Sequence, residues 1–95
     1  MPLTEPDIIA LIRCEFVDED MRKQYEPYWI RHLGGELILT EHKAEAFVTD
    51  ETTAQRHACS LNNSGERCQI SVQNHEGRIL TYKVRYVVIK YQQMQ

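Results

Sequence analysis

The fold is decided by the last long apolar run of the chain, residues 79–91, which reads ILTYKVRYVVIKY. Alternation of apolar and polar residues in its first half is the pattern of a β-strand with one buried and one solvated face. The continuous apolar face consists of Leu80, Tyr82, Val84, Tyr86 and Val88. The opposite face begins with polar residues and ends with apolar ones: Thr81, Lys83, Arg85, Val87, Ile89 and Tyr91.

This predicted strand is long for its sheet. It has thirteen residues, whereas an ordinary strand has about five or six. Its second half is apolar on both faces, and an exposed apolar edge promotes aggregation, so that half must be covered. Two arrangements satisfy this requirement. Either a second chain covers the strand, most simply another copy in a homodimer, or the strand lies between a helical layer and another segment of the same chain. We favour the first interpretation slightly.

Shorter strand patterns precede this one. Residues 68–73 alternate between apolar and polar, and segment 74–77 predicts a hairpin turn, with Gly77 in the left-handed position of a bulge. Residues 36–40 and 43–48 also have the composition of short strands, joined by a tight turn. These patterns predict an antiparallel sheet of about four strands.

Two structures are compatible with residues 49–61. Thr49 or Asp50 can cap a helix, and its apolar face would consist of Ala54, Ala58 and Leu61. The same residues can instead form a polar strand that turns through 63–65 into the next strand. We favour the helix, over about residues 50–61.

Helical spacing dominates the first third of the chain. Apolar residues recur at helical intervals over about 5–16, and Thr4 is suited to cap that helix. A second helix is predicted over about 19–33, and Pro27 should kink it. The apolar face of this second helix consists of Met21, Tyr25, Tyr28, Trp29 and Leu33.

These elements predict a single domain of the α+β class over residues 1–95, because a chain of this length has room for one core. The helical part spans about 4–34 and the mostly stranded part about 35–91. We expect two N-terminal helices packed on one face of an antiparallel sheet of about four strands, with a possible short extra helix at 50–61.

Charge is distributed unevenly along the chain. Residues 1–51 hold twelve Asp and Glu against five Lys and Arg, a balance of −7, whereas residues 52–95 hold two acids against six bases, a balance of +4. Such asymmetry indicates either a charged partner or two halves that face each other. We favour the second interpretation. The three cysteines, an odd count without a secretory signal pattern, indicate free thiols, and a cytoplasmic location is expected.

Histidine and cysteine gather in the second half, at His57, Cys59, Cys68 and His75. Structural zinc sites use closely spaced pairs of ligands, and only His57 and Cys59 are close. One intervening residue directs two helical side chains apart, whereas on a strand it places them on one face. The favoured helix therefore argues against a metal site. Because the chain also lacks catalytic and cofactor motifs, we expect no metal, cofactor or catalytic residue, and rank a small enzyme or ligand-binding domain third.

A nucleic-acid partner ranks second. Lys83 and Arg85 lie on the last predicted strand with tyrosines between them, and positive charge beside aromatic rings is how proteins hold single strands. Tyr82 and Tyr86, however, should face the opposite side from these bases, and the sequence pI of about 5.8 argues against a dedicated nucleic-acid binder.

Binding to another protein is the first-ranked function. The chain is small, lacks catalytic motifs and ends in a long apolar strand, so we expect a non-enzymatic interaction or regulatory protein that forms a homodimer. Aromatic residues often anchor such interfaces. The candidate contact residues are Tyr28, Trp29, Lys83, Arg85, Val87, Ile89 and Tyr91.

Overall fold

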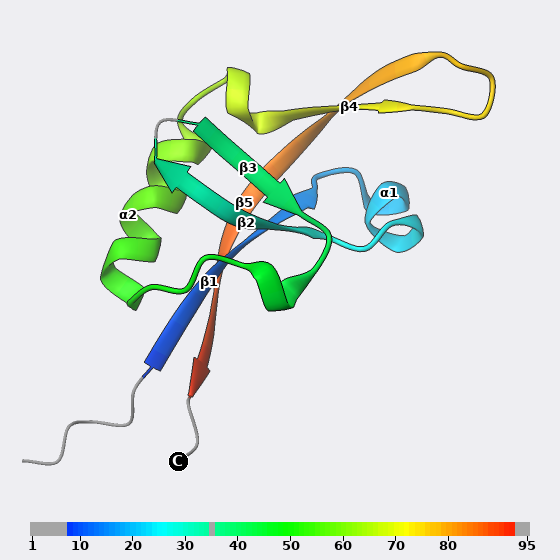
Figure 1. Cartoon of the computed structure of the whole chain (residues 1–95). Helices are drawn as coiled ribbons and strands as arrows, with labels where there is room; N and C mark the ends of the chain where they lie inside the picture. The colour runs from blue at the N-terminus through cyan, green and yellow to red at the C-terminus, as the bar shows by residue number, and fades with distance from the viewer. Residues whose placement is uncertain (1–7, 35, 93–95) are drawn as a thin grey trace, which may run out of the picture.

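The computed structural model describes residues 8–34 and 36–92. These residues form a curled, antiparallel five-stranded sheet in the order β3-β2-β1-β5-β4 (Figure 1). The strands are β1 (Ile8–Phe16), β2 (Tyr28–Gly34), β3 (Glu36–Thr40), β4 (Gln69–Gln73) and β5 (Ile79–Gln92). The helices are α1 (Glu19–Gln24) and α2 (Glu51–Asn62), with single 3₁₀ turns at Lys43–Glu45 and Glu66–Cys68.

The prediction of a helix over residues 5–16 is wrong, because residues 8–16 form the central strand β1. This strand pairs with β5 along its whole length, from Ile8 opposite Gln92 to Phe16 opposite Val84. Both faces of β1 carry buried residues, with Ala10 on one and Leu11 on the other. A strand buried on both faces has no polar alternation, so its apolar run resembles a helical face. The predicted helix start at residues 4–7 lies outside the described residues.

The second predicted helix, over 19–33, is correct only in its first turns. Helix α1 begins after Asp18, whose side chain accepts a hydrogen bond from the Met21 N–H, and ends at Gln24. Pro27 has no N–H and disfavours helical dihedral angles in the residue before it, so the chain becomes extended there. Residues 28–34 then form strand β2, whose Trp29 and Ile30 are buried.

The prediction of a strand over residues 43–48 is also wrong. These residues contain a 3₁₀ turn over Lys43–Glu45, and the Phe47 N–H donates to the Ile30 carbonyl at 2.7 Å. The described chain therefore has five strands instead of about four, and of its two α-helices only α2 is longer than six residues. Two N-terminal helices packed on one sheet face are not present in the described residues.

Four predicted elements are present, three of them with bounds shifted by one residue. The strand predicted at 36–40 is β3, those predicted at 68–73 and 79–91 are β4 and β5, and the helix predicted at about 50–61 is α2. Asp50 caps α2, with its carboxylate accepting from the Thr53 N–H at 3.0 Å. The hydroxyl of Thr53 donates to the same carboxylate, and this bond lowers the pKa of Asp50. Gly77 has φ +82°, the left-handed conformation that the bulged turn requires.

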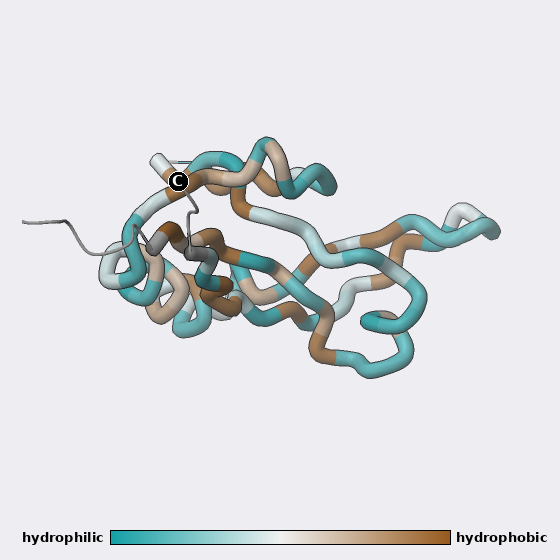
Figure 2. Tube along the Cα trace, turned by 90° about the horizontal axis from the view of Figure 1, so that it is seen from below, coloured by the Kyte–Doolittle hydropathy of each residue, from teal (hydrophilic) through white to brown (hydrophobic). Residues whose placement is uncertain are grey.

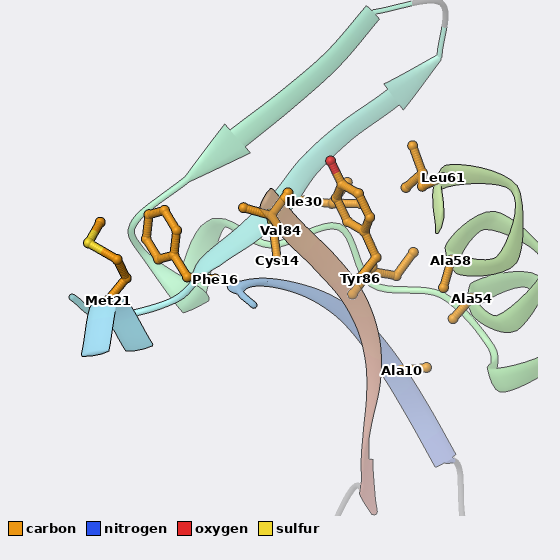
Figure 3. Packing of buried hydrophobic residues seen from close by; sticks show 11 residues of the cluster. Ala10, Cys14, Phe16, Met21, Ile30, Ala54, Ala58, Leu61, Val84 and Tyr86 are labelled. Carbon is orange, nitrogen blue, oxygen red and sulfur yellow. The ribbon is translucent and has the colours of Figure 1, made fainter. Parts of the chain in front are cut away.

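The main core lies between α2 and one face of the sheet. Ala54, Ala58 and Leu61 on α2 face Tyr86 and Ala10 on the sheet (Figure 3). The small alanines let the helix approach the sheet closely. A second cluster on the other face consists of Leu11, Trp29 and Ala46, against which Ile89 and Tyr91 pack.

The protein is elongated because one part of the sheet projects from the rest. The principal extents are 61 × 24 × 21 Å and the radius of gyration is 15.2 Å, compared with about 12 Å for a compact chain of this length. The projecting part is the β4–β5 hairpin, residues 69–83, which we call the arm (Figure 1). Hydrophobic and hydrophilic residues alternate along it (Figure 2).

Candidate interaction surface

Strand β4 forms one outer edge of the sheet, because within residues 8–34 and 36–92 its only neighbouring strand is β5. The Asn74 N–H donates to the Arg78 carbonyl at 2.9 Å at the turn, and the register continues with Val72 opposite Leu80 and Ile70 opposite Tyr82. Hydrogen-bonded and non-hydrogen-bonded pairs alternate in an antiparallel ladder. The main-chain groups of Ile70 and Val72 therefore point to β5.

The main-chain groups of Gln69, Ser71 and Gln73 consequently point outward from the sheet. β4 also carries no charged residue and no proline, so it lacks the usual features that protect an exposed edge from pairing. On the arm, the Ser71 hydroxyl lies 3.1 Å from the Thr81 hydroxyl of β5. These outward groups are the ones that an added strand would use for hydrogen bonds.

The two faces of the arm differ. Ile70, Val72 and Tyr82 are half-buried on the face that continues into the main core. The Tyr82 ring packs edge-on against Phe16, with ring centroids 5.9 Å apart. On the other face, Gln69, Ser71 and Gln73 are exposed. The arm is therefore anchored at its base by one apolar face.

The apolar end of β5 is half-buried against residues of its own chain. Ile89 and Tyr91 pack against the Leu11–Trp29–Ala46 cluster, and Val87 is half-buried on the same face. The Lys43 ammonium lies 3.8 Å from the centroid of the Tyr91 ring and 5.6 Å from that of Trp29. The alternative interpretation of this strand, burial between two layers of its own chain, describes this arrangement.

The remaining candidate contact residues are not brought together into one site. Tyr28 is half-buried and contacts the Phe16 ring, and burial raises its pKa. Lys83 and Arg85 are exposed on the face opposite the one that carries Tyr82 and Tyr86. Of the described tyrosines of β5, Tyr91 alone shares the face of these two bases. It lies six residues beyond Arg85 along the strand, with the Lys43 ammonium over its ring, so it does not stack beside them.

Ion pairs join the acidic and basic halves of the chain. Glu15 on β1 accepts from the Arg85 Nε at 2.7 Å, and Glu51 on α2 lies 2.9 Å from the Lys90 Nζ. The charge asymmetry is thus partly matched within the molecule, because β1 pairs with β5 and α2 packs against β5. The sequence analysis favoured two halves that face each other, but it did not identify which residues form the ion pairs.

Two adjacent groups in the core ionise with difficulty. Burial raises the pKa of the Cys14 thiol from 9.0 to about 12. It also raises the pKa of Tyr86, whose hydroxyl donates to the Arg67 carbonyl. Both groups are neutral at physiological pH, which suits a structural role.

The histidines and cysteines are dispersed. His57 lines a cleft of about 200 Å³ with Ser60, Glu36 and Arg67, between α2 and the β2–β3 hairpin. Cys68 donates to the Leu61 carbonyl at 3.1 Å, and His75 lies in the turn of the arm. Among the described residues, no three His, Cys, Asp or Glu side chains are grouped so that they could hold a metal ion.

The chain matches no protein-family model, no curated protein and no solved structure. Residues 8–34 and 36–92 contain no helix that is both long and apolar enough to cross a membrane. The features of the described residues that bear on function are the sheet edge at β4 and the neighbouring surfaces. Sequence reasoning missed that edge, although the uncharged order Gln-Ile-Ser-Val-Gln at 69–73 was a visible signal.

Proposed function

We propose that this protein acts by binding protein, and that it forms a homodimer in which the β4 strands of two copies pair. The observation that supports this proposal is the order of residues along β4, Gln69-Ile70-Ser71-Val72-Gln73. Read from either end about Ser71, it places amide opposite amide and a branched aliphatic residue opposite another. An antiparallel pair of strands related by a two-fold axis needs this kind of self-complementarity.

The outward main-chain groups fit such a pair. With Ser71 opposite Ser71 of the second copy, Gln69 would lie opposite Gln73. Because these are the three residues whose N–H and C=O groups face outward, the interface would contain about six main-chain hydrogen bonds. Ile70 would then lie opposite Val72 of the second copy, on the half-buried apolar face of the arm. Pairing would join the two sheets into one and would also cover part of the apolar face of each arm.

Charge does not oppose this arrangement. β4 itself is neutral. Glu66 and Arg67 precede the arm, Glu76 and Arg78 lie at its turn, and Lys83 adds one positive charge at its base. Antiparallel pairing brings the base of one arm near the turn of the other. No large surplus of like charge would accumulate at either end.

The proposal is tested with two matched variants, Ser71→Lys and Thr81→Lys. Both remove the contact between the Ser71 and Thr81 hydroxyls on the same face of the arm. Only Ser71→Lys places two ammonium groups opposite each other across the two-fold axis. Like charges juxtaposed in an interface cost several kcal/mol, so the dimer dissociation constant should rise by about 100-fold or more in Ser71→Lys and change little in Thr81→Lys.

Sedimentation equilibrium over a wide concentration range measures this constant directly. A wild-type chain that stays monomeric at millimolar concentration contradicts the homodimer. Equal dissociation constants for the two variants contradict the β4 edge as its interface.

Nucleic-acid binding stays a prediction with weaker support. Lys83 and Arg85 remain exposed, but Arg85 is paired with Glu15 and the two core tyrosines lie on the other face. A titration with labelled single-stranded oligonucleotides at low salt, using Lys83→Glu as the variant, decides between electrostatic binding and none.

A further inference from the structure

A second cleft lies inside the connection between β1 and β2, away from β4. It has a volume of about 190 Å³, which corresponds to about six water molecules. The end of β1, helix α1 and the start of β2 form its walls. The lining residues are Arg13, Glu15, Phe16, Arg22, Tyr25 and Pro27.

Glu15, the acidic residue in this lining, is already neutralised. One carboxylate oxygen accepts from the Arg85 Nε at 2.7 Å, and the other lies 3.2 Å from Arg13 Nη2. Its side chain is only 11% exposed. With both oxygens engaged by separate guanidinium groups, Glu15 has little capacity left to pair with Arg22.

The two arginines of the lining are not fully paired. The Arg13 Nε is buried beside the cleft and has no hydrogen-bond partner among residues 8–34 and 36–92, while the Arg13 side chain as a whole is partly exposed. Arg22 is half-buried, and within 8–34 and 36–92 it forms no ion pair. A buried donor without a partner lowers stability, and such groups in native proteins call for an explanation.

We infer that this cleft binds a small oxyanion, a phosphate or carboxylate group, between Arg13 and Arg22. Guanidinium groups match the planar or tetrahedral oxygens of these anions with paired N–H donors. The lining carries two arginines and one carboxylate, which leaves it positive even before Arg85 is counted. Phe16, Tyr25 and Pro27 supply the apolar remainder of the wall, and Tyr25 is 47% exposed.

This site is separate from the proposed dimer interface. None of its lining residues belongs to β4 or to the arm. Ser71→Lys should therefore leave anion binding unchanged, so failure of one proposal leaves the other standing.

The test is an NMR titration of the full chain with sodium phosphate or sodium acetate, at constant ionic strength set with sodium chloride. The signals followed are the arginine side-chain Nε–H groups and the backbone amides of residues 22–26 and 28. We expect saturable shifts at Arg13 and Arg22. A lost charge-assisted contact weakens binding by about tenfold or more, so Arg22→Ala should show this loss.

Lys23→Ala is the matched control, because Lys23 adjoins Arg22 on α1 and its side chain is 72% exposed. Tighter binding of phosphate than of acetate identifies a phosphate ligand, and the reverse order identifies a carboxylate. The inference is overturned if neither anion gives saturable shifts, or if Arg22→Ala and Lys23→Ala weaken binding equally. Arg13→Lys, which keeps the charge and removes Nε, should reduce affinity without unfolding the chain.

Discussion

The side chain of Asn62 forms hydrogen bonds with β5 of the kind that a neighbouring strand would form. Strand β4 ends its pairing at Lys83, and further along the same edge Asn62 binds the main chain of Tyr86. The Asn62 Nδ2 donates to the Tyr86 carbonyl and the Tyr86 N–H donates to the Asn62 Oδ1, both at 2.9 Å. This amide therefore ties the last turn of α2 to the sheet and blocks further pairing there.

Replacing Asn62 with Ala should destabilise the protein by about 2–3 kcal/mol. Each lost hydrogen bond removes about 0.5–1.5 kcal/mol, and the Tyr86 groups left without partners add a desolvation cost, since they lie in a part-buried site. Alanine is a better helix former than asparagine, so propensity acts in the opposite direction. A loss of this size lowers the melting temperature by about 10–20 °C in a domain of this length.

Urea unfolding followed by the fluorescence of Trp29 measures the loss, and hydrogen exchange of the Tyr86 amide locates it. Asn63→Ala is the control, because the neighbouring side chain makes only a 3.6 Å contact with the Cys59 Sγ. We expect its effect to stay within about 0.5 kcal/mol. Asn62→Asp should not restore stability, since its carboxylate would face the Tyr86 carbonyl. Equal stabilities for Asn62→Ala and Asn63→Ala would refute this reasoning.

Three further predictions concern the ionisation of Cys14, the reactivity of the three thiols and the contact of Lys43 with two aromatic rings. The pKa of the Cys14 thiol is about 9 in the unfolded chain and about 12 in the folded one, so between these two pH values ionisation favours the unfolded chain. The free energy of unfolding should therefore fall by about 1.4 kcal/mol per pH unit in this range. Cys14→Ala should make the free energy of unfolding depend less steeply on pH between pH 9 and 10, and an unchanged dependence would contradict the prediction. Labelling with a thiol reagent, mapped by mass spectrometry, should modify exposed Cys59 first, half-buried Cys68 more slowly and buried Cys14 only on unfolding. Labelling of native Cys14 at the rate of Cys59 would show that the core opens readily. Lys43→Gln should cost about 0.5–1 kcal/mol in urea unfolding, since it removes the cation from the Tyr91 and Trp29 rings, and Lys43→Arg should retain most of that energy.

Local signals determined the second half of the chain. The carboxylate of Asp50 marks the start of α2, Gly77 marks the bulged turn, and strict alternation marks β4 and the first part of β5. Each signal acts within a few residues, through a cap, a backbone conformation or a solvated face. These elements were predictable because no distant contact is needed to choose them.

The first half depended on tertiary contacts. The apolar residues of 8–16 satisfy a helical pattern and a strand buried on both faces equally well. Pairing with β5 on one side and β2 on the other decides for the strand. Trp29 and Ile30 likewise become strand residues, because Pro27 prevents the helix from continuing and both side chains are buried in the core.

The candidate surfaces divide in the same way. The sequence alone determined that β4 is uncharged and nearly symmetric about Ser71, but only the strand order made it an edge. The apolar end of β5 indicated an interface, and the structure adds that Ile89 and Tyr91 pack in part against the second core cluster. Local chemistry thus determined which segments form strands and turns where water reaches one face. Where both faces of a segment are buried, as in β1, only contacts with distant segments decided between helix and strand.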